Sequence, residues 1–174
     1  MDNLRKPALG PLTLIGGTAG LRNVHFPGRS PRLDPSDRDP AALAEAVSQL
    51  KQYFAGERRT FELALHLTGT TFQQRVWRAL KQLAYGSTTT YGGLARELGV
   101  TDSATVSAAR KVAWAIAATP TPIVLPCHRV LAADGSLTGY IGGLQRKQAL
   151  LDLEAAAGSP DTPRHRRQQQ LALP

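Results

Sequence analysis

The sequence predicts an α/β fold in two parts: a small N-terminal domain with a sheet and one helix, and a mainly helical C-terminal domain. Short apolar segments separated by glycine crowd the first 68 residues, which is typical of strands. Apolar residues at helical spacing dominate residues 69–158. The chain has 174 residues, 42% of them hydrophobic, which suffices for two subdomains that share a core.

The N-terminal domain, residues 1–68, is expected to hold three strands and a helix. Strands at 11–15 and 21–26 flank a turn that Gly16, Gly17 and Gly20 supply. After a proline-rich loop, Asp39-Pro40 predicts a helix start and Gly56 its end. Residues 61–67 alternate in hydrophobicity, which predicts a strand with one buried face. The residues at helical spacing on the helix are Leu43, Val47, Leu50 and Phe54.

The C-terminal domain begins with a helix that ends before Tyr85-Gly86 and carries Phe72, Val76, Leu80 and Leu83 on one side. Helices at 91–98 and 104–118, joined by a turn at 100–103, follow. Their order is that of a helix-turn-helix unit or of an ordinary helical hairpin, and the pattern does not decide between them.

A buried strand at 123–125 is expected to run into the only cysteine of the chain. A turn at 132–139 and a loop at 140–143 lead to a last helix at 144–157, with Leu144, Leu150, Leu151 and Leu153 as core candidates. Residues 159–174 carry a basic run and are expected to be a disordered tail.

The charge and the cysteine content of the chain indicate which class of partner and which compartment to expect. The formal net charge is +8 and the isoelectric point is about 10.3, which favours a polyanionic partner, nucleic acid first, or simply a basic surface. One cysteine excludes an intrachain disulfide. Without a secretory leader or a membrane-spanning apolar stretch, we expect a cytoplasmic protein whose thiol stays reduced.

Cys127 is the candidate nucleophile. A single buried cysteine is often a small packing residue, and reactivity requires a nearby base or positive charge that favours the thiolate. His128 and Arg129 follow it directly, but neighbours in a regular strand point to opposite sides. We therefore expect His128 to reach the sulfur through a water or a kinked backbone. Glu154 could orient the imidazole, or could be a solvated carboxylate.

Several motifs stand in a fixed order along the C-terminal domain. They are Phe72-Gln73-Gln74-Arg75-Val76-Trp77, Tyr85-Gly86, Thr90-Tyr91, Pro126-Cys127-His128-Arg129-Val130, Gly139-Tyr140, Gly142-Gly143, and Leu150-Leu151 with Glu154. These motifs resemble those of the O6-alkylguanine-DNA alkyltransferases. The resemblance covers residues 70–155 almost throughout, and residues 11–14.

The resemblance implies a ribonuclease-H-like N-terminal domain, followed by a helix-turn-helix of winged-helix type. It implies that Cys127 takes the alkyl group irreversibly from O6-methylguanine, and less efficiently from O4-methylthymine, so that each molecule acts once. His128 is the base, through a water; Glu154 orients it; Tyr91 donates a proton to the leaving base. No cofactor is implied, and with one cysteine we expect no metal site.

The partner implied is double-stranded DNA, bound through its minor groove with the alkylated nucleotide flipped out. Arg110 fills the gap in the stack, and the alanine-rich helix around it lies close to the groove floor. The resemblance implies a monomer and leaves cooperative binding open. Further pocket or DNA contacts are Tyr140, Thr119, Lys111, Val130, Ile141, Arg75 and Arg129, the last with a structural hydrogen-bonding role as its alternative.

The sequence departs from the family at four places. Thr119 replaces an asparagine that ties the recognition helix to the active-site loop, and a single hydroxyl cannot reproduce an amide. The segment between Tyr91 and Arg110 is longer than usual. Ile141 and Trp114 stand where small residues are common.

Two other functions stay open. An alkyltransferase-like protein binds the lesion without transfer, and the presence of Cys127 argues against it. A cysteine hydrolase or redox protein would show turnover or reversible thiol oxidation, and only the Cys127–His128 neighbours favour it.

Overall fold

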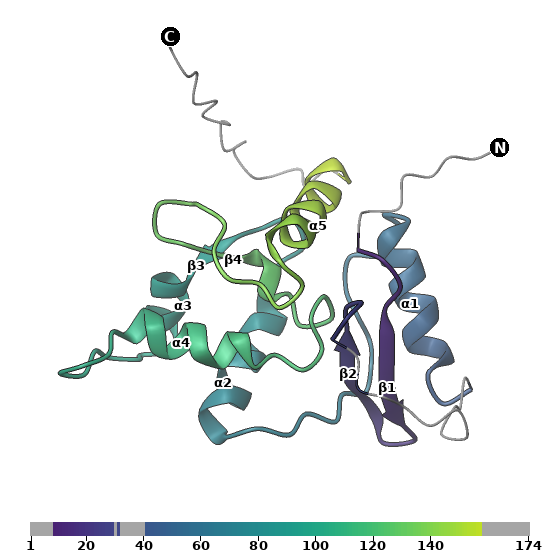
Figure 1. The fold of residues 1–174 in the computed structure, drawn as a ribbon, viewed down its shortest axis with the longest axis horizontal. Coiled ribbons are helices and arrows are strands. Elements are labelled where there is room, and N and C mark those ends of the chain that lie inside the picture. The colour runs from purple at the N-terminus through teal and green to yellow at the C-terminus, as the bar shows by residue number, and fades with distance from the viewer. Residues whose placement is uncertain (1–8, 30, 32–40, 158–174) are drawn as a thin grey trace, which may run out of the picture.

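The computed structural model describes residues 9–29, 31 and 41–157, and it divides them into two halves (Figure 1). One half holds the hairpin of β1 (Thr13–Gly17) and β2 (Gly20–His25) and helix α1 (Ala44–Phe54). The other holds helices α2 (Thr71–Gln82), α3 (Tyr91–Glu97) and α4 (Ala108–Ala117) with the short strands β3 (Thr89–Thr90) and β4 (Val130–Leu131). Helix α5 (Leu144–Ala156) lies where the halves meet. The two-part α/β and mainly helical arrangement is the one that the sequence predicts.

The N-terminal hairpin pairs β1 (Thr13–Gly17) with β2 (Gly20–His25) in antiparallel register, Thr13 opposite His25. Gly20 has φ of +115°, and a Cβ there would lie 2.3 Å from the carbonyl oxygen of Ala64. Only glycine fits this close approach of two backbones. The predicted glycine turn is therefore confirmed.

Residues 61–67 do not form the regular third strand that the sequence predicts, so this prediction is wrong. Its alternating exposure holds, but it pairs with β2 only at Leu21 and Leu65, through Leu21 N to Ala64 O and His66 N to Leu21 O, each 2.9 Å. The backbone of Glu62 is instead bound by the side chain of Gln49, which donates to its oxygen and accepts from its nitrogen. The buried side-chain amide of Gln49 thus makes the backbone hydrogen bonds that a neighbouring strand would otherwise make.

Helix α1 (Ala44–Phe54) follows a turn at 41–43, and the predicted start at Asp39-Pro40 lies outside the described residues. Gly56, with φ of +77°, follows its end as predicted. Val47, predicted to face the core, is 38% exposed. The buried residues are Ala46, Gln49, Leu50 and Tyr53, because two polar side chains on this face find internal partners.

The helical half begins with α2 (Thr71–Gln82), whose start is closed by a capping box between Thr70 and Gln73. Strand β3 (Thr89–Thr90) leads into α3 (Tyr91–Glu97), and α4 (Ala108–Ala117) packs against both α2 and α3. The helix-turn-helix order is confirmed.

Helix α4 begins at Ala108, four residues later than the sequence predicts. Ser107 caps α4 by accepting from Arg110 N, and Asp102 accepts from Ala108 N at 2.6 Å. Two side-chain acceptors therefore hold the chain outside the helix up to residue 107. The connection between α3 and α4 is a long loop and not the short turn expected.

The predicted strand at 123–125 is wrong, and the difference matters for the site. Ile123 has φ of +78°, and Leu125 N bonds Thr121 O in a tight turn. Pro126, with φ −78° and ψ 60°, forms an inverse γ-turn closed by Cys127 N to Leu125 O at 2.7 Å. A 3₁₀ helix (Cys127–Arg129) follows, because prolines at 120, 122 and 126 remove the donors that a strand needs.

Strand β4 (Val130–Leu131) pairs in parallel with β3, and α5 (Leu144–Ala156) completes the fold. Of the core candidates predicted for α5, Leu150 is fully buried, whereas Leu144 is 46% exposed. The predicted basic tail at 159–174 lies outside the described residues. In the part of the chain that is described, no helix combines the length and hydrophobicity needed to span a bilayer.

Residues 121–130 are buried without interruption and join two hydrophobic clusters. Cys127 and Val130 belong to the cluster of α2, α3 and α4. Ile123 and Val124 belong to the cluster built around the hairpin and α1. The cysteine is therefore held between the two halves of the molecule.

Candidate active site

The Glu154 carboxylate on α5 organises the buried groups around Cys127. Its Oε1 accepts from Tyr53 Oη at 2.7 Å and from His128 Nε2 and Arg129 Nη2, each at 2.8 Å. Its Oε2 accepts from Arg129 Nε at 2.9 Å and from Gly86 N at 3.0 Å. Burial raises the pKa of Glu154, but hydrogen bonds from His128 and Arg129 and the positive charge of Arg129 outweigh burial and hold it at about 2.

This arrangement sets the protonation of His128. Because Glu154 is ionised, the imidazole donates from Nε2, and Nδ1 is left as an acceptor. None of the described residues hydrogen-bonds Nδ1. Burial lowers the pKa of His128 despite the opposing effect of Glu154, which favours a neutral ring. A neutral imidazole with an unoccupied nitrogen can accept a proton.

Cys127 is 3% exposed, and burial raises the pKa of its thiol to about 12. The Lys147 ammonium, the Thr119 hydroxyl and backbone N–H groups oppose this rise. The resting thiol is therefore protonated. A thiolate forms only when a base takes the proton while these groups stabilise the charge.

Lys147 is a site residue that the sequence reasoning missed. It is fully buried, and its Nζ donates to Val130 O at 2.6 Å and to Thr138 O at 2.8 Å. Burial lowers its pKa, and Cys127 opposes that shift. Lys147, Leu150 and Glu154 recur at helical spacing on the buried face of α5, which was the available signal. Tyr53, also missed, lies on the buried face of α1.

Two tyrosines predicted for the site lie near the sulfur. Burial raises the pKa of both Tyr91 and Tyr140, and a thiolate at Cys127 would raise each of them further. Tyr91 Oη bonds Thr138 O at 3.3 Å, and its ring lies 5.9 Å from Lys147 Nζ. The Tyr140 ring lies 5.7 Å from that of Phe26 and 6.5 Å from that of His128.

Thr119 takes over part of what the expected asparagine does in the family. It is 1% exposed, and its nitrogen and hydroxyl both donate to Ile116 O, at 3.0 and 2.7 Å, at the end of α4. The hydroxyl is also a hydrogen-bond neighbour of the Cys127 sulfur, and it lowers the pKa of the thiol when it turns its one proton from Ile116 O to the sulfur. A single hydroxyl therefore links the end of α4 to the thiol.

The remaining predicted residues are not all brought to the cysteine. Arg129 is buried against Glu154 and donates to Leu83 O at 2.5 Å, which is the structural role left as its alternative. Arg75 donates to Leu98 O and Lys111 to Thr101 O, so both hold the α3–α4 connection. Ile141 packs against the cluster of the N-terminal half. Val130 lies in the helical core, and Arg110 is exposed on α4.

Comparison with known proteins shows the family of this chain. A family model described as "6-O-methylguanine DNA methyltransferase, DNA binding domain" matches residues 71–156. A second, "6-O-methylguanine DNA methyltransferase, ribonuclease-like domain", matches residues 4–67. The chain belongs to the 6-O-methylguanine DNA methyltransferase family. The resemblance and the fold class predicted from the sequence are thereby confirmed.

Relatives of this methyltransferase span nearly its whole length. A methylated-DNA–protein-cysteine methyltransferase of Mycobacterium tuberculosis H37Rv is 45% identical over 157 residues, 88% of this chain and 91% of the relative. One from Methanosarcina acetivorans is 40% identical over 85% of this chain and 94% of its own. The crystal structure of the M. tuberculosis OGT protein in complex with DNA matches at 42% identity with a TM-score of 0.76, covering 92% of this chain and 93% of that one.

Replacing Glu154 with glutamine should flatten the acid dependence of stability. The folded-state pKa of Glu154, about 2, lies below its ordinary value of 4.5, so the carboxylate stabilises the fold above about pH 4.5 and loses this effect as the pH falls toward 2. We expect the native free energy of unfolding to fall by roughly 3 kcal/mol more than that of E154Q across this window. Urea denaturation at a series of pH values measures both.

The variant should also be less stable at neutral pH, by roughly 3–5 kcal/mol, because Arg129 loses its buried partner. Glu97→Gln, at the exposed end of α3, is the matched control and should keep the native pH slope. An E154Q protein with the native slope would contradict the ionised carboxylate.

Proposed function

We propose that this chain repairs alkylated DNA by transferring the alkyl group from O6 of guanine to Sγ of Cys127. The observation that carries the proposal is the buried Cys127 thiol beside a His128–Glu154 pair, within a chain 45% identical to methylated-DNA–protein-cysteine methyltransferases. The sulfur attacks the alkyl carbon, the carbon–oxygen bond breaks, and its electron pair returns to the base. O4-methylthymine presents the same alkyl–oxygen bond and is the expected second substrate.

Proton movements balance the reaction. The thiol proton passes through a bridging water to Nδ1 of His128, and Glu154 stabilises the imidazolium that results. Tyr91 gives its proton to the departing base, so that one proton replaces the alkyl group on guanine. Lys147 stabilises the thiolate through its charge and acts as a positioning residue. The product thioether has no leaving group as good as the guanine, so the protein is used once.

DNA is the expected partner, since the related M. tuberculosis protein has been solved in complex with DNA. We propose that α4 lies in the minor groove of a duplex. Small side chains at Ala113 and Ala117 allow close approach, and Arg110 projects from the same helix. Because Cys127 is only 3% exposed, the target nucleotide has to leave the stack to reach it. Affinity from phosphate contacts makes binding salt-sensitive.

The proposal also includes a cellular location and an oligomeric state. The single cysteine of the chain is a free thiol, as is usual in a reducing compartment, which supports a cytoplasmic location. The groups assigned to the chemistry, Cys127, His128 and Glu154, all come from one chain, which supports action as a monomer.

Transfer predicts a defined change in mass. After incubation with duplex DNA containing O6-methylguanine, the intact protein should gain the mass of one methylene, located at Cys127 by peptide mass spectrometry. The gain should saturate at one group per molecule. Cys127→Ala should bind the same DNA within a few-fold and gain nothing. Binding without a gain in the native protein would favour a lesion-binding protein, and repeated turnover would favour a hydrolase.

Arg110→Ala should separate extrusion of the base from the chemistry. We expect the transfer rate from duplex DNA to fall by roughly tenfold or more, because the gap in the stack is left unfilled. Transfer from the free base O6-benzylguanine should stay within about twofold, since no duplex has to open. Single-turnover rates on the two substrates measure this. Equal losses on both substrates would contradict the role in extrusion.

A further inference from the structure

Trp114 is a large apolar side chain left in solvent. It is 60% exposed, more than any other large hydrophobic residue in the described part of the chain. The only other tryptophan of the sequence, Trp77, is 2% exposed and donates from Nε1 to Ala115 O at 3.0 Å. An indole that lies mostly in solvent is a candidate contact for a partner.

Its place on α4 restricts what that partner is. Trp114 follows Arg110 by four residues, so both side chains leave the same side of the helix about 6 Å apart along its axis. The exposed positions that continue this face are Ala117 and Ala118. Any molecule that covers α4 at Arg110 therefore meets the indole one turn further on.

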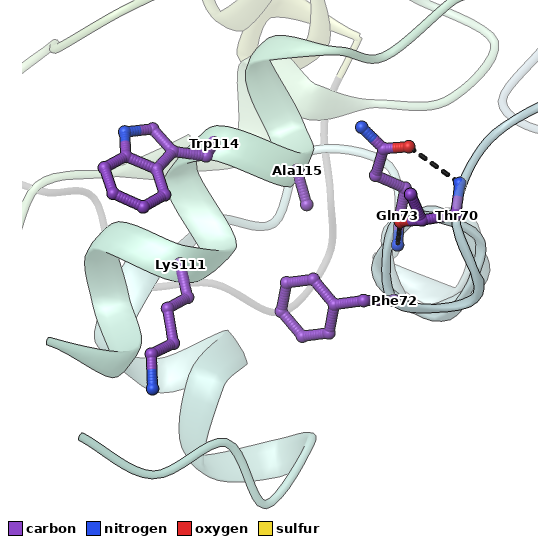
Figure 2. Close-up of a pocket in the computed structure, with 6 residues that line it drawn as sticks. All are labelled: Thr70, Phe72, Gln73, Lys111, Trp114 and Ala115. Atoms are coloured by element: carbon purple, nitrogen blue, oxygen red, sulfur yellow. Dashed lines mark hydrogen bonds between the residues drawn. The ribbon is translucent and has the colours of Figure 1, made fainter. Parts of the chain in front are cut away.

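The indole also borders a pocket of about 320 Å³ between α4 and the start of α2 (Figure 2). Trp114 and Lys111 extend from α4, and Phe72 extends from α2 toward α4, while the Trp114 indole points away from the Phe72 ring. The lining residues are Thr70, Phe72, Gln73, Lys111, Trp114 and Ala115, with no carboxylate among them. Two aromatic faces beside an ammonium suit a ligand that carries both flat apolar surfaces and negative charge.

The positive charge around the pocket favours a nucleic acid strand as its ligand. Between residues 69 and 118 the sequence holds six Arg or Lys and two Asp or Glu. Lys111 donates to Thr101 O, which uses one of the three protons of its ammonium and leaves two for a phosphate. A second copy of this basic chain would bring like charge to the same surface.

We propose that Trp114 and this pocket form an additional DNA contact, in which the indole packs against a nucleotide of one strand beside the point of base extrusion and Lys111 pairs with a phosphate. This proposal rests on the proposed function. The contact adds to duplex affinity, because stacking on an aromatic side chain is favourable for any base. It takes no part in the chemistry at Cys127, since none of its residues reaches the sulfur.

Intrinsic fluorescence tests the contact in the intact protein. Since the chain has two tryptophans, the difference between native and Trp114→Phe spectra isolates the exposed indole. Titration with undamaged duplex DNA should quench this emission by about half or more and protect it from acrylamide. Trp114→Ala should weaken duplex binding by about tenfold, and Trp114→Phe by no more than about twofold. Leu144→Ala, an exposed apolar position on α5, is the matched control and should bind normally.

Unchanged Trp114 emission and acrylamide access at saturating DNA would overturn the proposal, as would native affinity in Trp114→Ala. Quenching that depends on protein concentration in the absence of DNA would assign the surface to a second copy and would also overturn it. The transfer rate from free O6-benzylguanine should be native in Trp114→Ala. If the native protein neither bound DNA nor gained a methyl group, the proposed function itself would have failed. If the native protein transferred the methyl group but its Trp114 emission did not change on DNA binding, only the Trp114 contact would be wrong.

Discussion

A single buried carboxylate holds the active site together. Glu154 accepts hydrogen bonds from Tyr53 on α1, from Gly86 before β3, and from His128 and Arg129 in the 3₁₀ helix. A buried charge is tolerated only where it is paired and fully hydrogen-bonded, and the Arg129 guanidinium meets that need from two nitrogens. Three segments that are distant from α5 in sequence are therefore fixed to the same two oxygen atoms, and the two halves of the molecule meet at the turn that carries Cys127.

The same contact decides how reactive the thiol is. Glu154 fixes the proton of His128 on Nε2, which leaves Nδ1 available for the role of base that we propose for it. Burial keeps the Cys127 thiol protonated, with a pKa of about 12, and a protonated thiol resists oxidation. A protein that is used once benefits from a nucleophile that stays intact until a base occupies the pocket. Lys147, buried and hydrogen-bonded to two carbonyl oxygens, supplies the charge that makes the thiolate accessible at that moment.

The sequence predicts what depends on local pattern and misses what depends on distant partners. Helices α2, α3 and α5 follow from apolar spacing with capping or glycine residues, and the resemblance points to Cys127, His128 and Glu154. Residues 61–67 read as a strand because alternation does not reveal that Gln49 binds their backbone. Residues 123–125 read as a strand because a short apolar run does not reveal the positive φ of Ile123. Tyr53 and Lys147 were missed because ordinary core spacing hides a polar side chain whose partner lies far along the chain.

The position of the proton on His128 tests most directly whether Glu154 prepares this side chain to act as a base. With ¹⁵N-labelled histidine, long-range ¹H–¹⁵N correlation spectra distinguish the two ring nitrogens, and a His128→Gln variant assigns the signal among the four histidines. A Glu154-bound ring should be neutral, with its proton on Nε2 and Nδ1 unprotonated, between about pH 6 and pH 8. A proton on Nδ1, or a charged ring at neutral pH, would show that Glu154 does not prepare His128 as the base.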